Sequence, residues 1–108
     1  MNDTLEKLSE VIHNRRVHPE EGSYTCYLFD KGLDKILKKC GEECAETIIA
    51  AKNDGTDELA NEICDLLYHI MVLMEEREVP LSQVMGILDE RAQKIGNLKQ
   101  FHQVDRNS

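Results

Sequence analysis

The sequence predicts an all-α fold, and three features of its composition and pattern support this. Only two prolines and six glycines occur in 108 residues, so most of the chain is free to form long helices. Aromatic residues are scarce and tryptophan is absent, which disfavours a strand-rich sandwich or barrel. Apolar residues recur at intervals of three and four along most of the chain, the period of one face of a helix.

Two short helices are predicted in the first third of the chain. The first begins at Asp3, because an acid followed three residues later by a glutamate has the spacing of a helix start, and it ends near Arg16. Residues 17–22 contain a proline and a glycine and predict a connection. Ser23 is expected to cap a brief second helix, which ends at Gly32.

Two longer helices are predicted next, joined by a tight turn. Residues 33–53 form the first, and residues 53–55, Asn-Asp-Gly, form the turn. Thr56 is expected to cap the second helix, residues 57–77, which is apolar on most sides and should be the central, most buried helix. Together they should form an antiparallel hairpin. The expected buried face of the first helix consists of Leu33, Ile36, Leu37, Cys40, Cys44, Thr47, Ile48 and Ala51.

A final amphipathic helix is predicted after Pro80, with Ser82 as its expected cap and Gly96 near its end. Residues 97–108 are expected to form a loose C-terminal tail. We therefore expect a single all-α domain over residues 1–96. A domain of this length buries little surface alone, so we also expect a homodimer or a higher homo-oligomer.

The charge of the chain limits its partners. Thirteen basic and twenty-one acidic residues give a formal charge of −8, which argues against nucleic acid because no basic surplus is available to neutralise phosphates. An acidic chain that handles phosphates needs cations. The sequence begins with no apolar signal segment and contains no long uncharged apolar run, so neither a membrane span nor secretion is expected, and the expected compartment is the cytoplasm.

The four cysteines are expected to be thiols that pack in the core. Their successive spacings are 14, 4 and 20 residues, with no CxxC pair of the kind that binds zinc. In a reducing compartment a buried cysteine behaves as a small hydrophobe.

An acidic stripe lies on the second long helix. Glu62 and Asp65 are three residues apart and His69 follows four later, so all three project from one side of a helix. A buried carboxylate is costly unless it is paired or coordinates a metal. By itself this stripe fits a metal site and a plain solvent face equally well.

A matching acid pair on the preceding helix favours the metal site. Glu43 and Glu46 lie beside its apolar face, while Glu42 points further away. Two facing helices that each offer an i, i+3 acid pair can surround a divalent cation with oxygens, the ligands that magnesium prefers. Magnesium usually binds few carboxylates together with substrate phosphates, so the pattern indicates a phosphate-bearing substrate.

These motifs resemble a known family. The run EECAE (residues 42–46), followed after fifteen residues by EICD (residues 62–65), resembles the EExxE and ExxD signature of the all-α, MazG-like nucleotide pyrophosphohydrolases. Within that superfamily, residues 23–53 and 58–73 are similar to the phosphoribosyl-ATP pyrophosphohydrolases of histidine biosynthesis. The resemblance covers about residues 5–91. It implies that two helical hairpins pack into a four-helix core on dimerisation.

The resemblance also implies an activity, the hydrolysis of the α–β phosphoanhydride of phosphoribosyl-ATP to phosphoribosyl-AMP and pyrophosphate. By motif position, the residues that would hold Mg²⁺ and carry catalysis are Glu43, Glu46, Glu62 and Asp65, with Glu42 as a further metal candidate. Our hypothesis is that the metal neutralises the phosphates while one carboxylate orients or deprotonates a water for in-line attack.

Candidate substrate-binding residues are the basic cluster before the acids and the histidine after them: Lys31, Lys35, Lys38, Lys39 and His69. For each lysine, a solvated helix face is an equally good interpretation, and a histidine on a buried helix can simply be a satisfied core residue. Two alternative functions remain open on sequence grounds. One is a housekeeping nucleoside triphosphate pyrophosphatase of the same superfamily, and the other is a non-catalytic helical dimerisation module.

Overall fold

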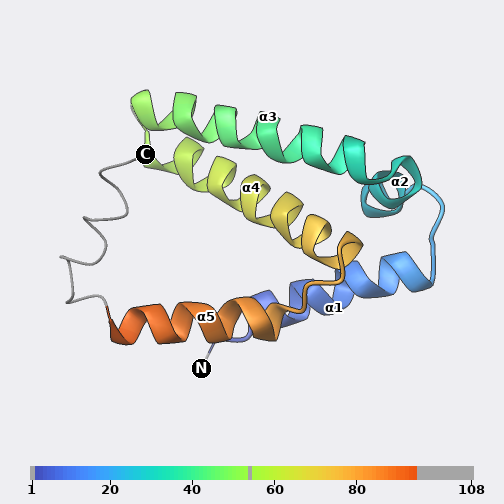
Figure 1. Cartoon of the computed structure of the whole chain (residues 1–108). Coiled ribbons are helices and arrows are strands. Elements are labelled where there is room, and N and C mark those ends of the chain that lie inside the picture. Colours follow the sequence, from blue (N-terminus) through green and yellow to red (C-terminus); the bar gives the residue numbers. More distant parts are fainter. Residues whose placement is uncertain (1, 54, 95–108) are drawn as a thin grey trace.

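The computed structural model describes residues 2–53 and 55–94, and over those residues the chain forms five helices and no strand (Figure 1). The predicted all-α class is therefore confirmed. The helices are α1 (Thr4–Val17), α2 (Tyr24–Lys31), α3 (Leu33–Lys52), α4 (Thr56–Glu76) and α5 (Leu81–Gln93). Each corresponds to a helix that the sequence predicts, and the ends that can be compared differ by at most a few residues.

The short helices begin and end partly as predicted. Asp3 precedes α1 but makes no capping hydrogen bond, and its carboxylate pairs with Lys7 one turn later instead. Ser23 does cap α2, because its Oγ accepts the backbone N–H of Cys26 at 3.2 Å. Gly32 ends α2 with a φ of +92°, a conformation that a residue with a Cβ adopts only under strain. This one residue lets the chain turn directly from α2 into α3.

Helices α3 and α4 form the predicted antiparallel hairpin and lie side by side along most of their length (Figure 1). Gly55, with a φ of +112°, occupies the N-cap position of α4. Thr56 is consequently the first helical residue and makes no capping hydrogen bond, so its predicted capping role is wrong.

The core lies at one end of this hairpin, where α1 and α2 pack against it. Five side chains with at most 6% exposure form it: Ile12, Leu28, Ile36, Met71 and Val72. The other end of the hairpin is not covered in the single chain, and Ile48 there is 61% exposed. The burial predicted for Leu37, Cys44, Ile48 and Ala51 is therefore wrong for one chain, because the face of α3 that packs inward carries Ile36, Glu43 and Ala50.

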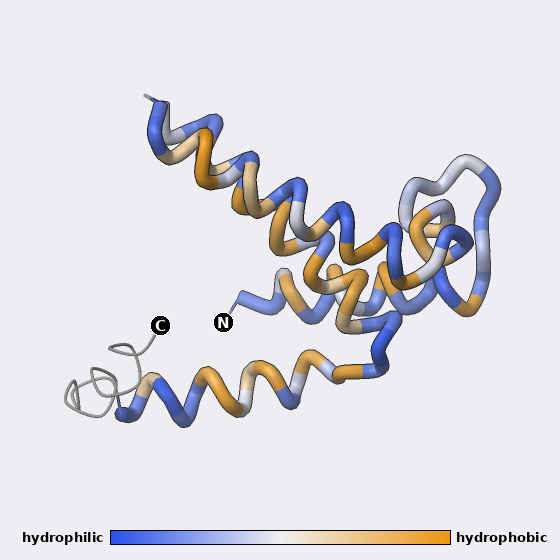
Figure 2. The backbone as a smooth tube through the Cα atoms, turned by 45° about the horizontal axis from the view of Figure 1, so that its top comes forward, coloured by the Kyte–Doolittle hydropathy of each residue, from blue (hydrophilic) through white to orange (hydrophobic). Residues whose placement is uncertain are grey.

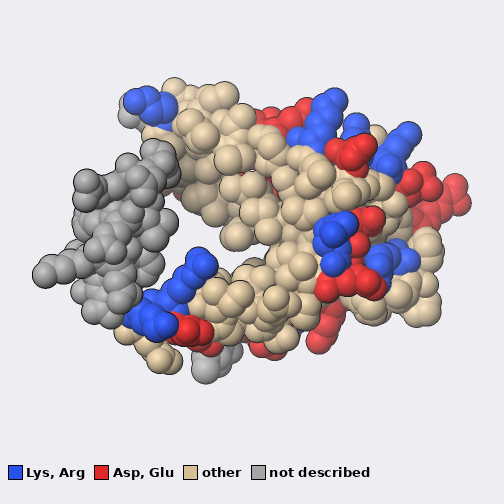
Figure 3. Space-filling view, in the orientation of Figure 1, with Lys and Arg blue, Asp and Glu red and all other residues tan. Residues whose placement is uncertain are grey.

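Helix α5 packs little against the rest of the described chain and runs apart from the hairpin (Figure 2). It has no buried residue, although Leu81 at its start contacts the core. Its N-cap is Pro80, and Ser82 is exposed within the first turn, so the predicted Ser82 cap is wrong. Figure 3 shows that side chains do not fill the space between α5 and the hairpin. The predicted helix end near Gly96 and the predicted tail, residues 97–108, lie outside the described residues.

The four cysteines are free thiols, as predicted. Cys26 and Cys40 are half-buried, but Cys44 and Cys64 are exposed, so core packing is wrong for these two in the single chain. No described helix is both long and apolar enough to cross a membrane.

Candidate metal centre

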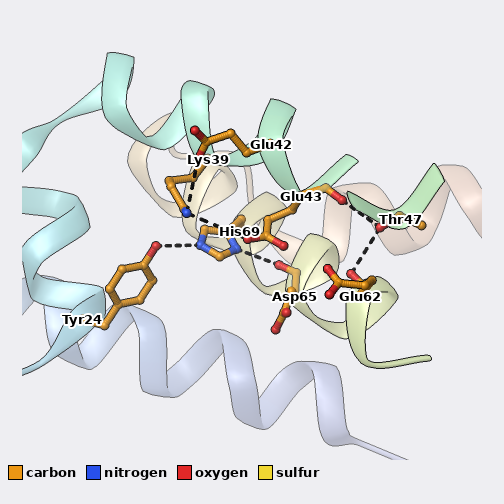
Figure 4. Close-up of polar contacts among 8 residues, drawn as sticks. All are labelled: Tyr24, Lys39, Glu42, Glu43, Thr47, Glu62, Asp65 and His69. Atoms are coloured by element: carbon orange, nitrogen blue, oxygen red, sulfur yellow. Dashed lines mark hydrogen bonds and ion pairs between the residues drawn. The ribbon is translucent and has the colours of Figure 1, made fainter. Parts of the chain in front are cut away.

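Three of the predicted ligand carboxylates come together between α3 and α4. One oxygen each of Glu43, Glu62 and Asp65 lies within 4.8 Å of the other two (Figure 4). Among the described residues, no other group of three or more acids, histidines or cysteines comes this close together. Glu43 is buried, Glu62 is half-buried and Asp65 is exposed, so the cluster is closed on one side and open to solvent on the other.

The packing of α3 explains why an acid lies inside the hairpin. Glu43 follows Ile36 by seven residues and precedes Ala50 by seven, which places all three on the inward face of the helix. The hydroxyl of Thr47, one turn further on, donates to the carbonyl oxygen of Glu43 at 2.8 Å and lies 3.3 Å from that of Glu62. Thr47 thus joins the two helices beside the cluster. We expected it only as part of an apolar face, and its position one turn after the acid was the available signal.

Burial and mutual repulsion shape the charge of the cluster. Burial raises the pKa of Glu43 to about 7, with further contributions from the nearby carboxylates of Glu46 and Asp65. Burial and then Glu46 also raise the pKa of Glu62. The Oε2 atoms of Glu43 and Glu62 are buried without a hydrogen-bond partner. Buried, unpartnered and mutually repelling oxygens are the donor set that a hard divalent cation would satisfy.

The two remaining acids of the motif lie at the edge of the cluster. Glu46 is exposed but close enough to act on the pKa of both Glu43 and Glu62. Glu42 is also exposed and forms an ion pair with Lys39, whose Nζ lies 3.3 Å from its carboxylate. The same Nζ is 3.9 Å from Glu43 (Figure 4). The structure thus places Lys39 and Glu46 beside the cluster and turns Glu42 away from it.

His69 contacts the backbone of a ligand candidate and not its carboxylate. Its ring is 5% exposed, and Nδ1 lies 2.7 Å from the carbonyl oxygen of Asp65. A carbonyl oxygen only accepts, so Nδ1 donates, and Nε2 faces the hydroxyl of Tyr24 at 2.9 Å. His69 therefore holds α2 against α4 next to the cluster. Sequence reasoning did not identify Tyr24 as its partner, because the two residues are 45 positions apart.

The other lysines of the basic cluster lie farther from the acids. Lys31 and Lys35 flank the ring of Tyr27, at 5.7 and 5.9 Å from its centroid. Lys38 is exposed and, one residue before Lys39, points about 100° away from it around the helix. Of the four predicted lysines, only Lys39 lies against the carboxylates.

This fold and this cluster define a class, the all-α proteins in which two antiparallel helices bring carboxylates together in a candidate metal site. The sequence model of one family of this kind, phosphoribosyl-ATP pyrophosphohydrolase, matches residues 5–92. The chain belongs to the phosphoribosyl-ATP pyrophosphohydrolase family, as its motifs predict.

Named relatives agree with this assignment over most of the chain. A phosphoribosyl-ATP pyrophosphatase of Clostridium botulinum (strain Kyoto / Type A2) is 55% identical over 98 residues, which cover 91% of this chain and 89% of the relative. A protein of the same name from Lactiplantibacillus plantarum is 54% identical over 95 residues, 88% of this chain and 90% of the relative. The histidine biosynthesis bifunctional protein HisIE of Caldanaerobacter subterraneus subsp. tengcongensis is 51% identical over 92 residues, which cover 85% of this chain and 45% of that protein.

Proposed function

We propose that this chain hydrolyses phosphoribosyl-ATP to phosphoribosyl-AMP and pyrophosphate, a step of histidine biosynthesis in the cytoplasm. The observation that carries the proposal is the family match over residues 5–92, which includes every acid of the cluster. Relatives that are more than half identical carry the name of this activity. A non-catalytic dimerisation module would have no use for buried carboxylates without partners, because such groups cost stability.

We propose Mg²⁺ as the cofactor, held by Glu43, Glu62 and Asp65, with Glu46 completing the set from the rim. Carboxylate oxygens are its preferred ligands, and the cluster offers no sulfur or imidazole. When bound, the ion supplies positive charge that neutralises the phosphates of the substrate. The open side of the cluster leaves room for phosphate oxygens to approach.

The chain's own residues can then supply the remaining chemistry. A water oxygen bonds to one phosphorus of the α–β anhydride, the bond from that phosphorus to the bridging oxygen breaks, and the bridging oxygen leaves with the other product. A carboxylate of the cluster takes up the proton of the attacking water. Lys39, which already lies 3.9 Å from Glu43, offers a point charge to a phosphate oxygen.

We further propose that two chains assemble through their hairpins into a four-helix core. Both helices carry apolar side chains that one chain leaves exposed, among them Leu37, Ile48, Ile63, Leu67 and Ile70. Helix α5 adds uncovered Ile87 and Leu88, and the space beside it is open (Figure 3). Apolar surface of this extent is typical of an interface.

The test measures pyrophosphate release from phosphoribosyl-ATP with Mg²⁺ and, separately, with EDTA. ATP and dUTP are run in parallel, and Glu10→Gln, an exposed residue on α1, is the matched control for a Glu43→Gln variant. We expect release only from phosphoribosyl-ATP, only with Mg²⁺, and not from Glu43→Gln. Release from dUTP but not from phosphoribosyl-ATP would replace this proposal with a housekeeping pyrophosphatase. No release from any substrate would reject it.

A further inference from the structure

A second group of side chains, on α2 and the start of α3, lies next to the metal centre but outside it. It consists of Tyr24, Tyr27, Lys31 and Lys35, and we call it the aromatic–lysine platform. The two tyrosine rings stack with centroids 6.0 Å apart and planes inclined by 23°. The two tyrosine residues are 44% and 41% exposed. Large aromatic rings in such positions are available to a planar ligand.

The lysines of the platform carry charge that the protein itself does not neutralise. The Nζ atoms of Lys31 and Lys35 lie 5.7 and 5.9 Å from the centroid of the Tyr27 ring. Within the part of the chain that the structure describes, neither forms an ion pair with a carboxylate, whereas Lys39 forms two. In a chain of net charge −8, two lysines without a carboxylate partner beside a partly exposed tyrosine are a site for an anion attached to a ring.

The platform is physically continuous with the metal centre. The Tyr24 hydroxyl contacts His69 Nε2 at 2.9 Å, and Figure 4 shows this tyrosine on the side of His69 away from Glu62. Lys35, Lys39 and Glu43 follow one another at four-residue intervals and so share one stripe of α3. At 1.5 Å of rise per residue, Lys35 and Glu43 lie about 12 Å apart along the helix. An elongated ligand can therefore reach from the carboxylates to the platform.

We propose that the platform binds the phosphoribosyl end of the substrate. This rests on the proposed function, because phosphoribosyl-ATP carries phosphate at two ends, a triphosphate and the single phosphate of the added ribosyl group. With the triphosphate at the carboxylates, the adenine packs against the exposed parts of Tyr24 and Tyr27, and the single phosphate lies between Lys31 and Lys35. Lys39 remains with the triphosphate.

Selectivity over ATP follows from this arrangement. ATP has the same base and triphosphate but lacks the far phosphate, so it leaves Lys31 and Lys35 unused. The two lysines should contribute to the binding of phosphoribosyl-ATP and little to that of ATP. A general electrostatic role of these lysines would instead affect both nucleotides alike.

The experiment compares wild-type protein with the double variant Lys31→Ala/Lys35→Ala. The KM and kcat for phosphoribosyl-ATP are measured, together with the inhibition constant of ATP against that reaction. We expect KM to rise roughly tenfold to a hundredfold with kcat nearly unchanged, because the lost contacts are charge-assisted and remote from the reacting phosphorus. The inhibition constant of ATP should change less than about threefold. Lys7→Ala, which removes an exposed lysine on α1, is the control for charge.

A second variant tests the ring independently of the charges. Tyr27→Leu keeps an apolar side chain but removes the π face, and should raise the KM roughly tenfold, whereas Tyr27→Phe should restore the wild-type value. Helical circular dichroism confirms that each variant folds.

The possible outcomes separate the two proposals. A wild-type protein that releases no pyrophosphate from phosphoribosyl-ATP refutes the proposed function itself. If wild-type protein releases pyrophosphate, two results for the double variant would refute the platform alone. One is an unchanged KM for phosphoribosyl-ATP, and the other is an inhibition constant of ATP that rises as much as that KM.

Discussion

Replacing Glu43 with glutamine should stabilise the metal-free protein while removing its function. The carboxylate is buried against like charges, and its pKa of about 7 means that the folded chain keeps a proton that the unfolded chain loses near 4.5. Between these values the folded state binds more protons, so its stability falls as the pH rises through this window and is lowest above pH 7. Glutamine has no charge to lose, and its amide can donate to the unpartnered Oε2 of Glu62.

The size of the effect follows from the same pKa. The difference between a pKa of about 7 in the folded chain and 4.5 in the unfolded chain corresponds to about 3 kcal/mol of lost folding stability at a pH above both values. We expect about half of this, roughly 1–2 kcal/mol, because Glu46 and Asp65 are exposed and water screens their charges. Glu43→Gln should therefore unfold at a higher denaturant concentration than wild type at pH 8 in EDTA. At pH 5 most of the difference should disappear.

Adding Mg²⁺ should make wild type more stable to unfolding than Glu43→Gln, the reverse of the order in EDTA. A ligand that binds only the folded state raises stability in proportion to the logarithm of its concentration over its dissociation constant, and only wild type keeps the full ligand set. Urea titrations at pH 5 and pH 8, each with EDTA and with Mg²⁺, measure all four combinations, with Glu10→Gln as the control for loss of one exposed carboxylate. If Glu43→Gln is no more stable than wild type at pH 8 in EDTA, the account of a strained acid cluster is wrong.

Three further predictions concern other parts of the chain. Glu46→Gln and Asp65→Asn should each abolish hydrolysis without changing the helical circular dichroism spectrum, because an amide removes charge but opens no cavity; full activity in both would reject their assignment. Ser23→Ala should lower the free energy of unfolding by about 1 kcal/mol in a urea titration, and an unchanged midpoint would contradict the capping role of the hydroxyl. Ile48→Glu should convert a dimer to monomers in analytical ultracentrifugation. Val11→Glu, which changes an apolar residue on α1 that is 48% exposed against 61% for Ile48, should not. A dimer that survives Ile48→Glu would exclude this face from the interface.

The helices were predictable because their signals are local. Apolar spacing located four of the five, and Ser23 and Gly32 located α2 by marking its two ends. The caps of α4 and α5 were harder, because the helices begin before the hydroxyl residues that were expected to cap: Gly55 is the residue before Thr56, and Pro80 lies two residues before Ser82. Helix α4 begins one residue earlier, and α5 two residues earlier, than the expected caps suggest.

The site was predictable to the extent that it depends on spacing within one helix. Glu62 and Asp65 share a stripe by helical geometry, but the proximity of Glu43 depends on which face of α3 packs inward. The apolar pattern predicted that a neighbouring face of α3 is the buried one. In the single chain that face is largely exposed. The contact between Tyr24 and His69 depends on how α2 docks on α4, which no local pattern encodes.

The glycine between α2 and α3 has a consequence for how this protein can vary. With no intervening loop, Gly32 couples the two helices directly, so the separation between Tyr27 and Glu43 is set by the geometry of the two helices and the conformation of this one residue. An insertion at this junction would rotate and displace α2 and break its contact with His69, whereas one near Gly55, at the far turn of the hairpin, would leave the acids in register. Length changes between natural variants should therefore concentrate at the second turn and be absent from the first.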